Sequence, residues 1–209
     1  MKKSRVVEVD RKKWNMGVAI CISFLIAIFV GAVVSNVISS EKVAVMGEEL
    51  KTFFSGVFEN GEEIRPSFSA IFMKYAKYVF LIWLGGWLPF GIILSGGVLM
   101  FRGASLGFTA AMLMKEFGVR GVIATIFTIL PQNLLLIPTY LFITWAAISF
   151  SVDRGTKKIG KAGLKRERTK KSTEYAIFFS GAVVCLALVS LLEVSVLPYF
   201  MKIAAVILK

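Results

Sequence analysis

The sequence predicts an all-α, polytopic membrane protein with about five transmembrane helices, the amino terminus in the cytoplasm and the carboxyl terminus outside. Of its 209 residues 56% are hydrophobic, and the mean hydropathy is +0.74, a composition typical of bilayer proteins. Apolar runs of about 20 residues, long enough to cross a hydrocarbon core, recur along the chain. Several runs have no polar face, so lipid is their expected surroundings. Without an internal repeat, residues 1–209 are predicted to form a single multi-pass domain.

The first predicted span covers residues 15–38, and a polar, acidic-leaning loop follows at residues 39–66, which we expect outside the cell. Apolar residues recur in this loop at the spacing of an amphipathic helix: Val43, Met46, Leu50, Phe53, Phe54, Val57 and Phe58. Such a helix rests on a membrane surface or docks on a partner, and the phenylalanines favour the surface.

Spans two and three are predicted at residues 72–94 and 98–114, as a hairpin with a tight turn at residues 95–97 on the cytoplasmic side. Arg102 comes early in span three. A charged side chain at mid-bilayer costs about 2.5 to 3.5 kcal/mol on insertion scales. We therefore expect Arg102 to extend its guanidinium to the inner membrane surface.

The segment from Gly103 to Gly107 matches the pattern of a serine-hydrolase elbow around Ser105. That elbow requires a strand-to-helix turn and a base, whereas this segment lies in an apolar run of a chain without histidine. We therefore predict no enzymatic activity. Gly103, Gly107 and Ala111 stand four residues apart, which favours close helix packing within the molecule, with a homo-oligomer interface as the alternative.

Span four is predicted at residues 121–150, which would measure roughly 45 Å as a straight helix. Pro131 and Pro138 lie inside it, and each deprives the carbonyl four residues earlier of its helical donor. We expect a kinked or broken helix here. Gln132 and Asn133 could satisfy those carbonyls or bond to a neighbouring helix. A substrate or ion site, as in transporters with broken helices, and partner binding are the other readings.

Residues 153–174 form a strongly basic loop, which predicts a cytoplasmic location and agrees with the basic residues ahead of the first span. Span five follows at residues 176–197, and the tail at 198–209 either prolongs it or lies at the interface. Glu193 lies near the outer end of this span. Hydration or a helix dipole there is favoured over a proton relay.

The net charge of +12 does not point to nucleic acid, because the basic residues are grouped beside apolar spans, where they set membrane orientation. The lipid bilayer is the expected surroundings. No metal cluster, phosphate loop or paired catalytic carboxylates are recognisable, and we predict no cofactor.

Nearly the whole chain resembles the stage II sporulation protein M family of endospore-forming bacteria. The most specific element is the run LPQNLLLIP at residues 130–138. The remaining matches are Gly31, Asn36, the stretch from Arg102 to Phe108, Gly118, Glu193 and Pro198.

The resemblance implies a multi-pass protein of the mother-cell membrane at the sporulation septum, needed for engulfment of the forespore. It would act as a scaffold that anchors and localises peptidoglycan hydrolases, with stage II sporulation proteins D and P as partners and peptidoglycan remodelling left to them. The alternative is a transporter or the membrane subunit of an ATP-driven pump, which the broken span four and Glu193 would suit.

Overall fold

The computed structural model describes residues 2–38, 45–52, 56, 67–88, 90–156 and 164–208. Its principal helices are α1 (Lys2–Val37), α3 (Phe68–Trp87), α4 (Gly91–Thr156) and α5 (Leu164–Leu208), and residues 45–52 form a short further helix. Every regular element in these ranges is helical, which confirms the predicted all-α class.

Within the described residues, four segments are long and apolar enough to cross a membrane. They lie at Lys13–Val37, Phe68–Trp87, Gly91–Arg154 and Thr169–Val196. The third, with 64 residues, would measure about 96 Å as a straight helix, whereas a hydrocarbon core is about 30 Å thick. An upright rod of that length does not fit a bilayer.

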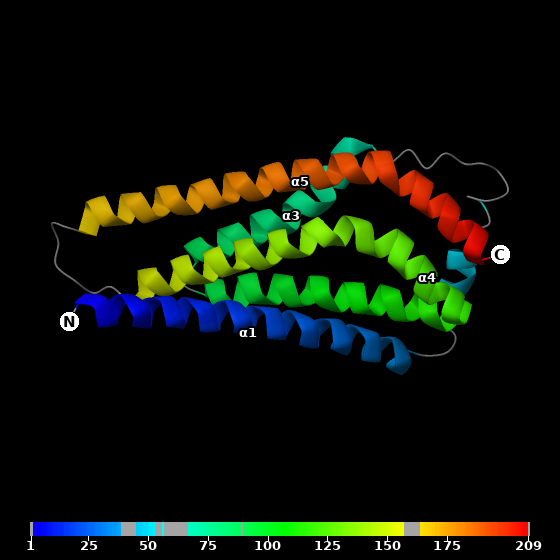
Figure 1. Cartoon of the computed structure of the whole chain (residues 1–209), viewed down its shortest axis with the longest axis horizontal. Helices are drawn as coiled ribbons and strands as arrows, with labels where there is room; N and C mark the ends of the chain where they lie inside the picture. The colour runs from blue at the N-terminus through cyan, green and yellow to red at the C-terminus, as the bar shows by residue number, and fades with distance from the viewer. Residues whose placement is uncertain are drawn as a thin grey trace.

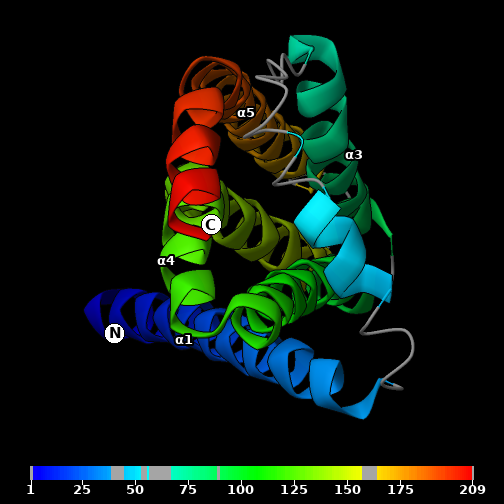
Figure 2. The ribbon, with the colours of Figure 1, turned by 90° about the vertical axis from the view of Figure 1, so that its right-hand side faces the viewer.

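Helix α4 instead folds back on itself, so that its two arms run in opposite directions beside α1, α3 and α5 (Figure 1). Viewed from the end in Figure 2, the reversal stands beside the carboxyl terminus. Helix α4 contacts each of the other three helices, and α3 also contacts α5. The two arms of α4 therefore form the centre of the bundle.

Gly118 makes this reversal. Its φ of 57° and ψ of −133° are the non-helical values inside α4. A side chain is strained in this region of backbone space, which glycine enters freely. The arms also meet closely at Gly121, where a Cβ atom would stand 2.0 Å from the Leu113 carbonyl oxygen. Both positions require the absence of a side chain.

The turn between α3 and α4 corrects the predicted boundaries of spans two and three. Helix α3 ends at Trp87 and α4 begins at Gly91, so the predicted turn residues 95–97 lie inside α4. Leu88 has an extended backbone (φ −85°, ψ 149°), the conformation favoured for a residue that precedes a proline, here Pro89. Ser95 donates a buried hydrogen bond to the Ile82 carbonyl across this turn (2.9 Å).

The second arm of α4 stays helical through Pro131 and Pro138, so the expected break at these residues is not found. The arm bends instead (Figure 1). Prolines remove single backbone hydrogen bonds, and a helix packed on several sides tolerates that loss by bending.

Helix α5 (Leu164–Leu208) includes most of the carboxyl-terminal tail. It continues past Pro198 to Leu208, so the tail extends the helix, while the apolar candidate span ends at Val196. The short helix at residues 45–52 falls within the predicted amphipathic segment, and its Leu50 packs on a small cluster containing Leu113 and Ala204. The other predicted stripe residues at 43, 53, 54, 57 and 58 lie outside the described residues.

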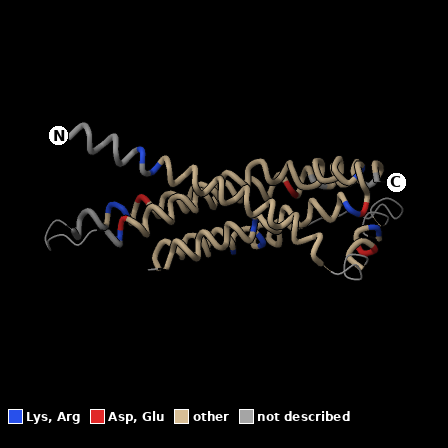
Figure 3. The backbone as a smooth tube through the Cα atoms, turned by 90° about the horizontal axis from the view of Figure 1, so that it is seen from below, with Lys and Arg blue, Asp and Glu red and all other residues tan. Residues whose placement is uncertain are grey.

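Charged residues gather at the two ends of the bundle (Figure 3). The end with the amino terminus carries Arg11, Lys13, Arg154 and Lys170, and Lys171 there pairs with Asp153. At the opposite end Lys51 of the short helix forms a 2.6 Å salt bridge with Glu116 of α4. The hydrogen bond to Glu116 raises the pKa of Lys51 above its usual value.

Candidate functional site

Three polar side chains from three helices meet in the interior of the bundle. Tyr75 of α3 is 1% exposed and donates a 2.6 Å hydrogen bond to Oε2 of Glu193 on α5, which is 6% exposed. The amide of Gln132, on the second arm of α4, lies 3.1 Å from the Tyr75 hydroxyl. We call Tyr75, Gln132 and Glu193 the polar cluster.

The charge of Glu193 decides how the Gln132 amide is oriented. Because the single hydroxyl proton of Tyr75 is engaged with Glu193, an amide oxygen facing a charged carboxylate would set acceptor against acceptor. With the amide turned over, Nε2 donates to both carboxylate oxygens at 2.9 and 3.0 Å. A charged Glu193 therefore receives hydrogen bonds from two helices.

Arg102 lies on the first arm of α4 among three aromatic rings. Its guanidinium carbon is 5.6 Å from the ring centroid of Tyr75, 4.9 Å from that of Tyr78 and 5.3 Å from that of Tyr140. Such cation–π contacts stabilise a cation away from water.

This environment corrects the expectation that Arg102 reaches the inner membrane surface. Helix α4 begins at Gly91 rather than at residue 98, so Arg102 lies about 16 Å along the axis from the helix start. Figure 3 shows that basic and acidic residues lie in the middle of the bundle as well as at its ends.

Glu193 lies three residues before the end of the apolar segment Thr169–Val196, which agrees with its predicted place near one end of span five. Helix α5 itself runs on to Leu208, about 22 Å beyond Glu193.

Tyr75 joins these two opposite charges. Its ring faces Arg102 and its hydroxyl group binds Glu193, so a positive and a negative side chain are linked through one tyrosine. Pairing of this kind is how ionisable side chains are accommodated inside a membrane. The arrangement ties α3, both arms of α4 and α5 together.

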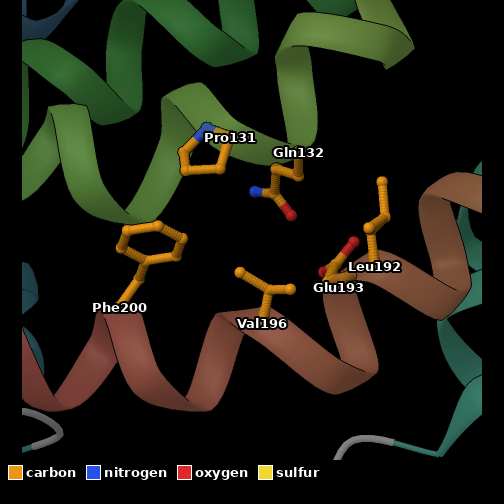
Figure 4. A pocket seen from close by; sticks show the side chains of 6 residues that line it. All are labelled: Pro131, Gln132, Leu192, Glu193, Val196 and Phe200. Carbon is orange, nitrogen blue, oxygen red and sulfur yellow. The ribbon is translucent and has the colours of Figure 1, made fainter.

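A pocket of about 100 Å³ opens beside the polar cluster, and six residues line it: Pro131, Gln132, Leu192, Glu193, Val196 and Phe200. Figure 4 shows the Gln132 amide and the Glu193 carboxyl group pointing toward each other, with the Phe200 ring farther along α5. The pocket is therefore apolar except where it meets the cluster.

The other residues of the predicted proline segment lie apart from the cluster. Asn133 is buried and donates to the Ile129 carbonyl in its own helix at 2.7 Å, while its Oδ1 has no hydrogen-bond partner. It lines a separate apolar groove between α1 and the two arms of α4. Pro138 is exposed on the bundle surface. Gln132 therefore has one of the two roles predicted for the amides, hydrogen bonding to a neighbouring helix.

Gly103 and Gly107 face α1. A Cβ atom on Gly107 would stand 1.9 Å from the Ile28 carbonyl oxygen, and one on Gly103 would stand 3.1 Å from Ala27 and Phe24. Ser105, between them, donates to the Phe101 carbonyl of its own helix at 2.8 Å. The two glycines allow the backbones of α1 and α4 to approach within the molecule.

The family model described as Stage II sporulation protein M matches residues 20–198, most of the chain. The chain belongs to this family. The matched range contains Arg102, Gln132 and Glu193, so the interior charges of this stage II sporulation protein M family member lie within the part that matches. No curated protein and no solved structure matches the chain significantly.

Arg102, Gln132 and Glu193 were predicted from the sequence as site residues, whereas the tyrosines that connect them were not. Tyr75, Tyr78 and Tyr140 come from two helices and are distant from Glu193 in the sequence. The available signal was the i, i+3 spacing of Tyr75 and Tyr78, which places both rings on one helix face.

Proposed function

We propose that this chain is a non-enzymatic scaffold of the cell membrane that anchors and localises peptidoglycan hydrolases at the septum for forespore engulfment during sporulation. The observation that carries the proposal is the family match over residues 20–198, which supports a sporulation-related membrane protein. Stage II sporulation proteins D and P are the proposed partners.

The interior of the bundle supports a positioning role. Tyr75, Gln132 and Glu193 engage one another, and Arg102 engages three aromatic rings. Such mutual pairing fixes the helices relative to one another. A rigid body with charged, accessible ends suits a protein that holds others in place.

We further propose that the chain crosses the membrane five times, because each arm of α4 is long enough to cross once. This places residues 45–52 and the Gly118 reversal at one membrane face and the amino terminus at the other. Arg11, Lys13, Arg154 and Lys170 lie at the amino-terminal end, so the positive-inside rule favours a cytoplasmic location for that end.

Cysteine labelling tests the orientation. Cys21 and Cys185 are free and exposed, so both are first replaced with alanine. Single cysteines are then placed at Glu49 and Lys170, exposed residues near opposite ends of the bundle. A membrane-impermeant maleimide applied to intact cells should label position 49 and not position 170. The reverse pattern would overturn the orientation and the scaffold role with it.

Site-specific crosslinking tests the partners. A photo-crosslinking amino acid at Glu49 should capture wall hydrolases in sporulating cells, and the same probe at Glu174, exposed in the proposed cytoplasmic segment, should capture none. Purification of the tagged chain with and without crosslinking gives the complementary measurement. Hydrolases absent from the Glu49 sample would contradict the proposal.

A transporter or the membrane subunit of an ATP-driven pump is the second candidate. The observation in its favour is the interior carboxylate of Glu193 beside a pocket. Purified protein in liposomes, loaded with a pH-sensitive dye and placed under an imposed membrane potential, separates the two. Flux that disappears in Glu193→Gln would support transport, and equal traces with and without protein would support the scaffold.

A further inference from the structure

The pocket beside the polar cluster contains the one carboxylate that the described residues place in the middle of the bundle. We propose that Glu193 is a proton-binding site reached through this pocket, and that the Gln132 amide turns over when the proton binds. This inference goes beyond the scaffold role and does not depend on it.

The side chains around Glu193 already provide hydrogen-bond donors for a charged carboxylate. Tyr75 donates to Oε2 of Glu193 at 2.6 Å, and Nε2 of the turned Gln132 amide donates at 2.9 Å to Oε1 and at 3.0 Å to Oε2. Hydrogen bonds to an ionised group are stronger than those between neutral groups. Arg102, whose guanidinium carbon lies 5.6 Å from the centroid of the Tyr75 ring, supplies the opposite charge.

The same positions also satisfy the protonated state. When Oε1 of Glu193 carries a proton it becomes a donor, and an amide that presents its oxygen at the same 2.9 Å separation accepts that hydrogen bond. Tyr75 continues to donate to Oε2. The two states differ by a turn of one amide about its last torsion, and the helices need not move.

The pocket supplies room for water beside the carboxylate. A cavity needs a volume of roughly 10–15 Å³ and polar partners to hold one water molecule. The pocket has about 100 Å³, and Gln132 and Glu193 are its polar lining residues. In the binding step a hydronium ion in the pocket gives its proton to the carboxylate, which forms a carboxylic acid and leaves a neutral water molecule.

The groups that face Glu193 come from the elements packed around it. Helix α3 contributes the Tyr75 hydroxyl, and Lys74 and Lys77 on the same helix are exposed. The second arm of α4 contributes the Gln132 amide. Arg102, on the first arm, contacts the rings of Tyr75 and Tyr140. Proton binding neutralises Glu193 and removes the negative charge that Tyr75 links to Arg102.

Infrared spectroscopy of the full chain in lipid nanodiscs tests the site. The experiment records difference spectra between about pH 4 and pH 9, a range that covers ordinary and perturbed carboxyl groups. Acidification should produce a carbonyl band of a carboxylic acid in an apolar environment, and incorporation of ¹³C-glutamate should shift that band. Glu193→Gln should abolish it, whereas Glu174→Gln, at an exposed site, should leave it in place.

The hydrogen bonds provide a second measurement that does not need the Glu193 variant to fold. In Tyr75→Phe the carboxyl group loses one donor, so the band should move to higher frequency while it remains visible. Absence of a glutamate-dependent band in the wild-type protein across the whole range overturns the proposal. A band that depends on sodium at constant ionic strength, with choline as the replacement, also overturns it and points to a metal-cation site.

Discussion

Gly31 of α1 lies so close to Ala104 of α4 that a methyl group on Gly31 would stand 1.9 Å from the Ala104 carbonyl oxygen. Because the obstacle is backbone, the clash cannot be relieved by rotating a side chain. Together with the Gly107 contact, this approach fixes how far apart α1 and the first arm of α4 lie.

Gly31→Ala should therefore destabilise the bundle by about 1 to 3 kcal/mol, the cost of overpacking. The matched control is Gly97→Ala, because a Cβ atom at Gly97 meets no atom within 4 Å. Unfolding in mixed detergent micelles, followed by circular dichroism, measures both. Equal stability of the two variants would show that α1 tolerates displacement.

Tyr75→Phe should cost about 1.5 to 3 kcal/mol, since it removes a hydrogen bond to a charged group that stays buried. Tyr78→Phe is the control, because its ring contacts Arg102 through a face that phenylalanine retains. Measured under the same conditions, the unfolding midpoint should be lower for Tyr75→Phe than for Tyr78→Phe.

Arg102 and Glu193 should be energetically coupled through Tyr75. Arg102→Met and Glu193→Gln each leave one interior charge without its counterpart, whereas the double variant removes both charges. A double-mutant cycle should give a coupling energy of about 0.5 to 3 kcal/mol. Strictly additive effects would mean that the two charges do not sense each other.

Replacement of Pro131, Gln132 and Asn133 with leucines should impair assembly or engulfment more than replacement of the outer-loop glutamates. The triple variant removes the amide that donates to Glu193 as well as a proline of the bent arm. Gln132→Leu alone should account for most of the loss. Spore counts and fluorescence microscopy of engulfment measure the effect, and wild-type sporulation in the triple variant would refute the prediction.

Gly118→Ala should destabilise the protein by about 1 to 3 kcal/mol through backbone strain. A steric clash does not contribute, because no atom lies within 4 Å of the added methyl group. Gly96→Ala, with equally open surroundings inside a regular helical segment, is the control. Protease sensitivity near residue 118 should rise in the first variant and stay unchanged in the second.

Hydropathy predicted the helical class and the positions of most apolar segments, because lipid leaves few alternatives to helices. It did not predict the turn at Leu88, because the glycines at 96 and 97 match a turn pattern, whereas α3 ends at Trp87 and Leu88 has the extended backbone favoured before a proline. Whether residues 198–208 continue the last helix was left open, because composition does not decide it. Local sequence patterns could not predict the surroundings of Arg102, because the aromatic rings that it contacts belong to residues 75, 78 and 140.

The reversal at Gly118 also sets the rotational phase of the second arm. Gln132 lies 14 residues beyond it, and each residue turns a helix by about 100°. Inserting a single alanine between them would swing the amide a quarter-turn or more away from Glu193, although hydropathy would scarcely change. The spacing from 118 to 132 is thus a length constraint on the chain, separate from any constraint on its composition.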